Sequence, residues 1–296
     1  MRTSALIAGV AILLLSFVAV GIWSAVLSHD TRGVLTVSFL DVGQGDAIFI
    51  SAPSGRTVLI DGGPDAGVLR QLGDVMSWYD HSIDVVMPTH PDTDHISGLV
   101  DVLERYHVSY VVQSSVEGSA PIWHALESTI TSNAKSGTRV ITALRGQIID
   151  LGGSTGSPQV AHAYLEILSP DRSMPHVDTN DGCVVTRLVY GKTAFMLPCD
   201  APQAVENYLV YEDGANLHSD VLKAGHHGSN TASSPLFVGF VSPQYAIYSR
   251  GCNNKYGFPH AETIATFARL HIATLDTCKQ GTIRFKSNGQ TVTLDK

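Results

Sequence analysis

The densest group of possible metal ligands lies in the stretch MPTHPDTDHISGL, Met87 to Leu99. It places His90, Asp92, Asp94 and His95 within six residues, directly after the apolar run IDVVM. Imidazole and carboxylate groups are natural ligands of divalent cations, and a cation relieves the repulsion between clustered carboxylates. A tight loop after a buried strand would let all four side chains converge. The alternative is a solvated polar turn that caps the next helix, with Asp94 near the N-cap.

Three further apolar runs end in residues of the same kind. Asp200 ends FMLPCDAP, His226 and His227 lie in VLKAGHHGS, and Asp61 ends VLIDGG. Ligands of layered α/β proteins bind at the loops that follow strands. Four separate strands that end in such residues therefore favour a metal site over a polar turn.

The segments FLDVGQGDA (39–47), LIDGG, THPDTDHISG, PCDA, LKAGHHGS and NKYGFPH (254–260) occur in this order along the chain. In order and spacing they resemble the metallo-β-lactamase superfamily and, within it, the extracellular domain of ComEC-type DNA-uptake proteins. The resemblance covers nearly all of residues 34–296. The superfamily motif H-x-H-x-D-H has Asp92 in place of its second histidine, as is typical of the ComEC-like branch. The membrane channel and the oligonucleotide-binding-type domain of those proteins have no counterpart here, so a hydrolase is expected rather than a DNA transporter.

The resemblance implies a dinuclear centre. His90 and Asp92 would hold the first metal ion, and Asn180 or Asp181 in TNDGC would complete its ligands. The second ion would be held by Asp94, His95 and His226, and Asp200 would bridge the two ions. The resemblance also implies that Asp61 braces the ligand loop. The expected catalytic residues are Asp94, Asp200 and His227, and the expected substrate-binding residues are Lys223, Ser229 and His260.

Two divalent ions ~3.5–4 Å apart can share a water, lower its pKa to about 7 and hold both the attacking and the leaving oxygen. Asp92 adds a hard, anionic oxygen ligand, which favours manganese over zinc. It also makes the first ion less electrophilic, so cleavage of a phosphodiester is expected rather than opening of a β-lactam.

The composition suits a large core, because 44% of the 296 residues are hydrophobic and only 16% are charged. The net charge of -8 lacks the basic footprint of most nucleic-acid binders and favours a small substrate. Four basic residues could contact phosphate, although residues of these types are more often solvated surface charges: Arg187, Lys223, Arg250 and Lys255.

The pattern of strands and helices predicts an α/β protein. We expect an αββα sandwich of two mixed sheets covered by helices, formed by residues 34–296 as one domain and preceded by one transmembrane helix. Of the four cysteines, Cys252 and Cys278 could form a bridge in an exported domain. The alternative is that all four are small buried hydrophobes.

Residues Ala5 to Leu27 carry no charge. A helix of this length rises ~35 Å, enough to cross a bilayer. We expect a signal anchor over residues 1–28 and a linker over 29–33. Arg2 favours an N-inside orientation, with the catalytic domain outside the cytoplasm. Cleavage near Ser24, which would release a secreted domain, is the alternative.

Together these features predict a membrane-anchored, outward-facing binuclear metallohydrolase that cleaves phosphodiesters, and the resemblance alone implies single-stranded DNA as its substrate. A second hypothesis keeps the fold and takes a small phosphodiester or a β-lactam instead. A third is a non-catalytic metal-binding module.

Overall fold

The computed structural model describes residue 9 and residues 12–21, 33–153 and 161–295. Its contacts divide the chain into two units, residues 1–32 and 33–296. In the first unit, residues 12–21 are helical. Across the part of the chain that is described, no helix has both the length and the apolar composition needed to cross a bilayer. The predicted anchor and linker lie largely outside the described residues, so their boundaries stay a prediction.

The first sheet of the larger unit has eight strands in the order β15-β14-β1-β2-β3-β4-β5-β6. Strands β15 to β3 of this order pair antiparallel, and β3, β4, β5 and β6 pair parallel. Of the parallel strands, β3 and most of β4 are buried apolar runs because both of their faces are covered, whereas β6 is exposed. The bounds are β1 Leu35–Phe39, β2 Ile48–Ser51, β3 Thr57–Ile60, β4 Ser82–Met87, β5 His107–Gln113, β6 Arg139–Thr142, β14 Ile283–Ser287 and β15 Val292–Asp295.

The second sheet has seven strands in the order β13-β12-β11-β10-β9-β8-β7. Its β7 to β10 pair antiparallel and its β10 to β13 pair parallel, so both sheets are mixed, as predicted. The bounds are β7 Ile148–Gly153, β8 His162–Ser169, β9 Val185–Tyr190, β10 Thr193–Leu197, β11 Val221–Lys223, β12 Tyr245–Tyr248 and β13 Ala273–Asp276.

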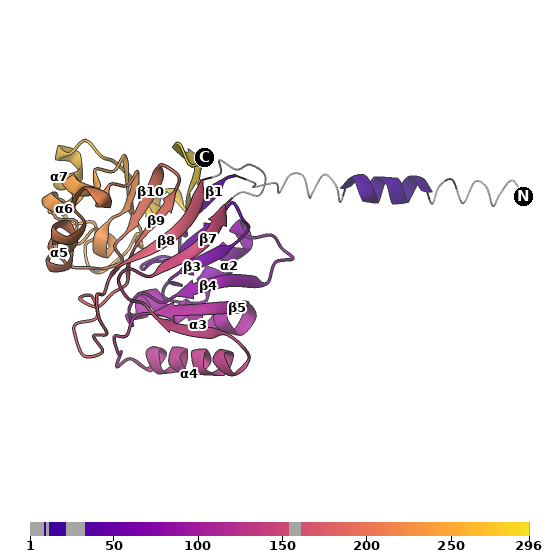
Figure 1. Ribbon diagram of the computed structural model, residues 1–296, viewed down its shortest axis with the longest axis horizontal. Coiled ribbons are helices and arrows are strands. Elements are labelled where there is room, and N and C mark those ends of the chain that lie inside the picture. Colours follow the sequence, from indigo (N-terminus) through magenta and orange to yellow (C-terminus); the bar gives the residue numbers. More distant parts are fainter. Residues whose placement is uncertain (1–8, 10–11, 22–32, 154–160, 296) are drawn as a thin grey trace, which may run out of the picture. The chain divides into compact units, whose positions relative to one another are not determined.

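Helices cover the outer faces of both sheets, which confirms the predicted αββα sandwich. Figure 1 shows α3 and α4 beside the first sheet and α5, α6 and α7 beside the second. Side chains of both sheets pack into a central core, and each sheet forms a second core with its own helices. The bounds are α2 Gly67–Val75, α3 Thr93–Arg105, α4 Pro121–Lys135, α5 Gln203–Asp213, α6 Pro235–Val241, α7 Ala261–Arg269 and α8 Thr277–Gln280, with the short 3-10 helices η1 Gly214–Leu217 and η2 Gly225–Gly228.

Close backbone packing brings the loops after β1, β3 and β4 together. Gly45 has a φ of +131°, and a Cβ built there would lie 1.9 Å from the carbonyl oxygen of Asp94. A Cβ on Gly98 of α3 would lie 2.2 Å from the carbonyl oxygen of Gly62. Only glycine permits both approaches. As a result, the start of α3 sits directly on the loop that follows β3.

Candidate metal centre

Four buried side chains, Asp46, His95, Asp200 and His227, form the tightest group of metal-ligand atoms in the described residues. One ligand atom from each lies within 4.8 Å of the others. Asp46 immediately precedes the segment that enters β2, and His95 lies in the first turn of α3. Asp200 follows β10 and His227 lies in η2, after β11. The two sheets therefore contribute to the group equally.

In both histidines of this group, one ring nitrogen is hydrogen-bonded to a residue that is not itself in the group. His95 Nδ1 lies 2.8 Å from Asp61 Oδ2, and His227 Nδ1 lies 2.8 Å from the carbonyl oxygen of Ser249. A carboxylate and a carbonyl accept hydrogen bonds only, so each Nδ1 carries a proton and each neutral ring presents the Nε2 lone pair. These two Nε2 atoms lie 3.3 Å apart. This is the arrangement in which two imidazoles can share one cation.

Asp61 holds the ligand loop as well as His95. Its carboxylate accepts hydrogen bonds from the Thr89 backbone N–H at 2.8 Å and from Thr89 Oγ1 at 2.7 Å. Thr89 Oγ1 in turn lies 3.0 Å from His90 Nδ1. One buried carboxylate therefore orients both histidines of the HPDTDH segment, directly or through Thr89.

The carboxylate of Asp200 contacts three histidines and one lysine. Its Oδ2 lies 3.3 Å from His95 Nε2, 3.2 Å from His227 Nε2 and 3.6 Å from His226 Nε2. Its Oδ1 pairs with Lys223 Nζ at 3.0 Å, and the same Nζ lies 2.5 Å from Asp46 Oδ2. The ammonium group thus neutralises part of the charge of two buried carboxylates, while Asp200 keeps one oxygen for the histidines.

The ionisation of these groups follows from their pairing. Burial raises the pKa of Asp200, but His227, Lys223 and His95 outweigh burial and hold that pKa well below its usual range. Burial lowers the pKa of His95, but Asp200 and Asp61 raise it well above its ordinary value. For His226, burial is the dominant cause and lowers the pKa. Without a cation, the neighbouring carboxylates therefore favour the protonated form of His95, whereas burial favours the neutral form of His226.

A second set of donors lies beside the first. His90 Nε2 is buried without a hydrogen-bond partner and lies 3.5 Å from Asp92 Oδ2. The His90 and His95 ring centroids are 4.1 Å apart. Asp94 Oδ2 lies 3.4 Å from His227 Nε2. Buried polar atoms are rarely left unpaired, so the unpaired His90 Nε2 among imidazole and carboxylate donors fits a divalent cation.

The two residues considered for the remaining ligand position differ in their surroundings. Asn180 is partly buried, and its Oδ1 has no hydrogen-bond partner in the structure. Asp181 is exposed. An unpaired buried amide oxygen can coordinate a hard cation, so Asn180 is the better candidate of the two.

Several residues around the centre have the left-handed backbone conformation. The φ angles of Asp61, Cys199, His226 and His227 are 57°, 48°, 47° and 56°. This region is unfavourable for residues with a Cβ and is found mostly where the surrounding structure enforces it at functional sites. The local conformation also turns the consecutive side chains of His226 and His227 in different directions.

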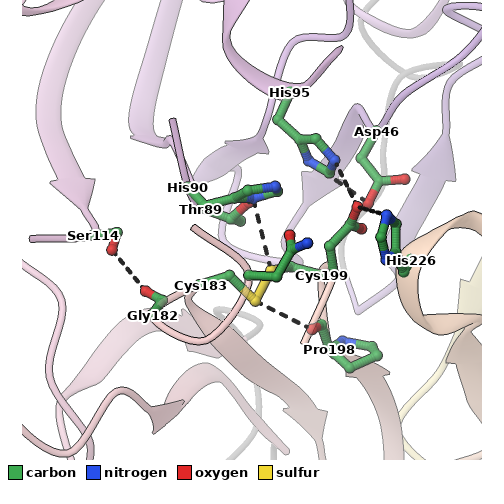
Figure 2. Close-up of a disulfide and its surroundings, with 12 residues drawn as sticks. Asp46, Thr89, His90, His95, Ser114, Gly182, Cys183, Pro198, Cys199 and His226 are labelled. Atoms are coloured by element: carbon green, nitrogen blue, oxygen red, sulfur yellow. Dashed lines mark hydrogen bonds and ion pairs between the residues drawn. A yellow bond between two sulfur atoms is a disulfide. The ribbon is translucent and has the colours of Figure 1, made fainter. Parts of the chain in front are cut away.

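A disulfide joins Cys183 to Cys199 directly beside the centre. Figure 2 shows it next to His90, with His95, Asp46 and His226 pointing toward one another on the other side of Cys199. Cys199 Sγ lies 3.9 Å from His90 Nδ1. The Cys199 carbonyl oxygen accepts hydrogen bonds from Lys223 Nζ at 2.9 Å and from the His226 N–H at 3.1 Å.

Several predicted site residues have surroundings that differ from their expected roles. His226, expected as a metal ligand, is the more exposed of the two adjacent histidines, whereas His227, expected as a catalytic residue, belongs to the tight buried group. Lys223 was predicted to bind substrate, yet it is 0% exposed and pairs with Asp46 and Asp200. Because it lies on a buried strand, it cannot reach a ligand in solvent.

Two further predicted substrate contacts are occupied by the protein itself. Ser229 is 3% exposed, and its hydroxyl lies 2.9 Å from Thr231 Oγ1. His260 Nδ1 accepts a hydrogen bond from the Asn230 N–H at 3.0 Å, and its Nε2 lies 3.1 Å from the Tyr256 carbonyl oxygen. Both residues therefore help to hold the loops around η2 together, and their contact with a substrate stays a prediction.

The sequence analysis missed Asp46 and the Cys183–Cys199 disulfide. Asp46 lies in the quoted motif FLDVGQGDA, where an acidic residue before a buried strand was a signal that could have been used. Of the two alternatives left open for Cys252 and Cys278, the structure has the disulfide. Cys183 and Cys199 flank the β9–β10 hairpin, whose register pairs Thr186 with Leu197 and brings the two cysteines close, so the hairpin was a signal that could have been used.

The comparisons with known proteins agree with the fold. The family described as the metallo-beta-lactamase superfamily matches residues 40–234. The chain belongs to this superfamily. It is 27% identical over 270 residues to ComE operon protein 3 of Bacillus subtilis, in a match that covers 84% of this chain and 33% of that protein. It is 40% identical over 122 residues to the competence protein ComA of Neisseria gonorrhoeae, covering 41% of this chain and 17% of that protein.

These relatives place the chain with the ComEC-like members of the metallo-β-lactamase superfamily, as predicted. The match spans a third or less of the length of both competence proteins. Among solved structures, Igni18, a metallo hydrolase from the archaeon Ignicoccus hospitalis, shares the fold with a TM-score of 0.50 at 14% identity. That match covers 84% of this chain and 98% of Igni18.

Proposed function

We propose that this chain is a binuclear metal-dependent hydrolase that cleaves phosphodiesters and acts on single-stranded DNA. The observation that carries the proposal is the position of Asp200, one oxygen of which faces His95, His227 and His226 at 3.2 to 3.6 Å. Membership of the metallo-β-lactamase superfamily supports hydrolysis. The relationship to competence proteins supports a DNA substrate.

The donor set fits two divalent cations. His95, His227 and Asp200 would hold one, with Asp94 and Asp46 beside them. His90 and Asp92 would hold the other, with Asp200 between the two ions and Asn180 as a further donor. Such a pair of ions, when bound, supplies a hydroxide nucleophile near neutral pH and neutralises charge on a phosphate. The number of carboxylates among the donors favours manganese over zinc.

The protein groups would divide the remaining work. Asp61 and the Ser249 carbonyl hold the two inner imidazoles in one orientation, which keeps the donors preorganised. His226 is suited to accept a proton at the edge of the centre, because its lowered pKa favours the neutral imidazole and its side chain is 27% exposed. Lys223 keeps Asp46 and Asp200 anionic in a buried site.

The test combines metal analysis with substrate choice. The purified chain should contain about two manganese or zinc ions and should cut labelled single-stranded DNA. Asp200→Asn should lose metal and activity. Asp220→Asn is the matched control, because Asp220 accepts a hydrogen bond from the Ala194 N–H at the far end of β10. Full activity of Asp200→Asn would refute the proposed centre.

A second candidate is hydrolysis of a small phosphodiester. The net charge of -8 favours it, since a long polyanion is repelled by an acidic surface. Cleavage of bis-p-nitrophenyl phosphate without cleavage of any DNA would support this alternative. Bound metal with no turnover of either substrate would leave a metal-binding module.

The proposal includes an anchored, outward-facing placement. The uncharged run of residues 5–27 supports an anchor. The two disulfides support an oxidising compartment, because such bonds are rare in the cytosol.

A further inference from the structure

A cavity of about 290 Å³ opens next to the centre. Asp92 and Asp94 of the ligand set line one part of it, and Ser119, Thr179 and Tyr256 line the rest. Its size is near the lower end for small-ligand pockets, which begin at about 300 Å³. Whatever reacts at the centre therefore has room on this side for one compact group.

Tyr256 is the aromatic side chain of this cavity, and it is 50% exposed. Its ring stacks on Phe258 at a centroid distance of 5.3 Å and an interplanar angle of 18°. Phe258 is buried, and its centroid lies 5.5 Å from that of His226 and 6.0 Å from that of His227. The exposed ring is thus held in a fixed relation to the histidines of the centre.

A cation accompanies the ring. Lys255 is exposed, and its Nζ lies 5.2 Å from the centroid of the Tyr256 ring. An exposed cation–π contact is weak, so a flat group can replace it on the ring and leave the ammonium free to pair with an anion. The same positive charge disfavours a quaternary ammonium group, such as that of a choline ester, at this ring.

The other basic residues considered as phosphate contacts are engaged elsewhere. Arg250 pairs with Asp276 at 2.6 Å, and Arg187 donates to the His218 carbonyl oxygen at 2.7 Å. Lys223 is buried under the centre. Of these four candidates, Lys255 remains available to a polyanion, and it is the one beside the cavity ring.

We propose that Tyr256 is a stacking platform for the nucleobase next to the scissile phosphodiester, with Lys255 pairing to a neighbouring phosphate. This deepens the proposed function and rests on it. A base can stack on a side chain only when it is free of its own duplex, so the platform selects single strands. Stacking is tolerant of base identity, because every base has a π face.

The experiment measures binding and cleavage separately with the manganese-loaded full chain. The probe is a fluorescein-labelled single-stranded oligothymidine, read by anisotropy, and a matched strand with abasic residues. Tyr256→Ala should weaken binding of the normal strand by about tenfold to a hundredfold, with unchanged metal content. Tyr256→Phe should bind like the parent protein. Tyr211→Ala, which removes a tyrosine that is 85% exposed and does not line the cavity, is the matched control.

The abasic strand gives the decisive comparison. It should bind the parent protein as weakly as the normal strand binds Tyr256→Ala, and the substitution should not weaken it further. Equal binding of the normal strand by the parent protein and Tyr256→Ala would overturn the platform, even if DNA is cut. Tyr256-dependent turnover of p-nitrophenyl phosphocholine without Tyr256-dependent DNA binding would also overturn it. Tyr256-dependent binding without any cleavage would refute the proposed function but not the platform.

Discussion

At the residue scale, the structure predicts that Lys223 is needed for stability, because it is a completely buried cation between two carboxylates. Lys223→Met should destabilise the metal-free protein by about 3–5 kcal/mol, since removing one partner leaves buried charge uncompensated. A divalent cation should restore much of this loss by neutralising the same carboxylates. Urea unfolding with and without manganese measures both effects.

The same variant separates a supporting role from a substrate contact. If Lys223 bound substrate, Lys223→Met would raise KM and leave the stability nearly unchanged. A variant that is as stable as the parent protein without metal would contradict the pairing described above.

Asp61 should act on metal affinity although it is not in the tight ligand group. Its two oxygens accept three hydrogen bonds, from Thr89 and His95, and the amide of Asp61→Asn would turn an N–H group toward at least one of these donors. We expect metal affinity to fall ~10–100-fold, measured by competition with a chelator. Asp84→Asn is the control, because Asp84 accepts two hydrogen bonds from Thr57 away from the centre. Equal loss of affinity in both variants would contradict the orienting role.

Residue types and spacing identified most of the centre but not the direction of each side chain. His90, Asp92, Asp94, His95 and Asp200 could be picked out because they follow apolar strands. Which of two consecutive histidines points inward depends on left-handed backbone angles that no residue preference indicates. Lys223 was expected to be accessible to substrate because lysine is rarely buried, and its two carboxylate partners explain why it is buried here.

At the element scale, Glu206 of α5 links this helix to the segment that begins α6. It is fully buried and accepts hydrogen bonds from the N–H groups of Ser233 and Ser234 at 2.5 and 2.8 Å. Burial raises its pKa to about 7, against the opposing effect of these hydrogen bonds. The folded state therefore retains a proton that the unfolded chain releases at lower pH.

The sign of the pH dependence follows. Below about pH 4.5 both states hold the proton, and above about pH 7 neither does, so the folded state loses stability as pH rises between these values. The loss should total about 3 kcal/mol and should be absent in Glu206→Gln. The difference in unfolding free energy between the two proteins, measured by urea at several pH values, should change by this amount. A difference that is constant with pH would contradict the prediction.

Both disulfides should contribute to stability, but only one of them should contribute to metal binding. Each closes a loop of moderate length, so removing either should cost about 3 kcal/mol of stability. Only the Cys183–Cys199 bond fixes the residue that precedes Asp200 and contacts His90. Replacing both of these cysteines by alanine should weaken metal binding in a chelator competition. The matched Cys252→Ala/Cys278→Ala variant should not, and a similar loss in both would show that the effect is general destabilisation.

The elements were predicted better than their ends. A tight loop was expected to carry His90, Asp92, Asp94 and His95, whereas α3 begins at Thr93, because Asp92 in extended conformation occupies the N-cap position. Asp94 and His95 therefore lie on a helical turn rather than in a loop. A turn at this point brings Asp94 beside His227 and keeps His95 on the buried side of the helix.

At the scale of the whole molecule, the centre lies where the two sheets meet. Asp46, Asp61 and His90 to His95 belong to the first sheet and its connections, and Asp200, His226 and His227 belong to the second. Neither sheet with its connections supplies all of these donors by itself. The sandwich could be predicted from the resemblance, but periodicity alone does not say which strand ends face each other, because pairing across layers depends on long-range packing.

The division of the chain into residues 1–32 and residues 33–296 leads to a prediction about what removal of residues 1–32 would change. Every donor and orienting residue described above lies in residues 33–296, which form one unit by their own contacts. A chain without residues 1–32 should therefore keep the metal affinity of the full chain. If residues 5–27 form an anchor, the full chain should sediment with membranes and resist carbonate extraction, whereas the shortened chain should not. Extraction of the full chain by carbonate alone would contradict the anchor without affecting the metal centre.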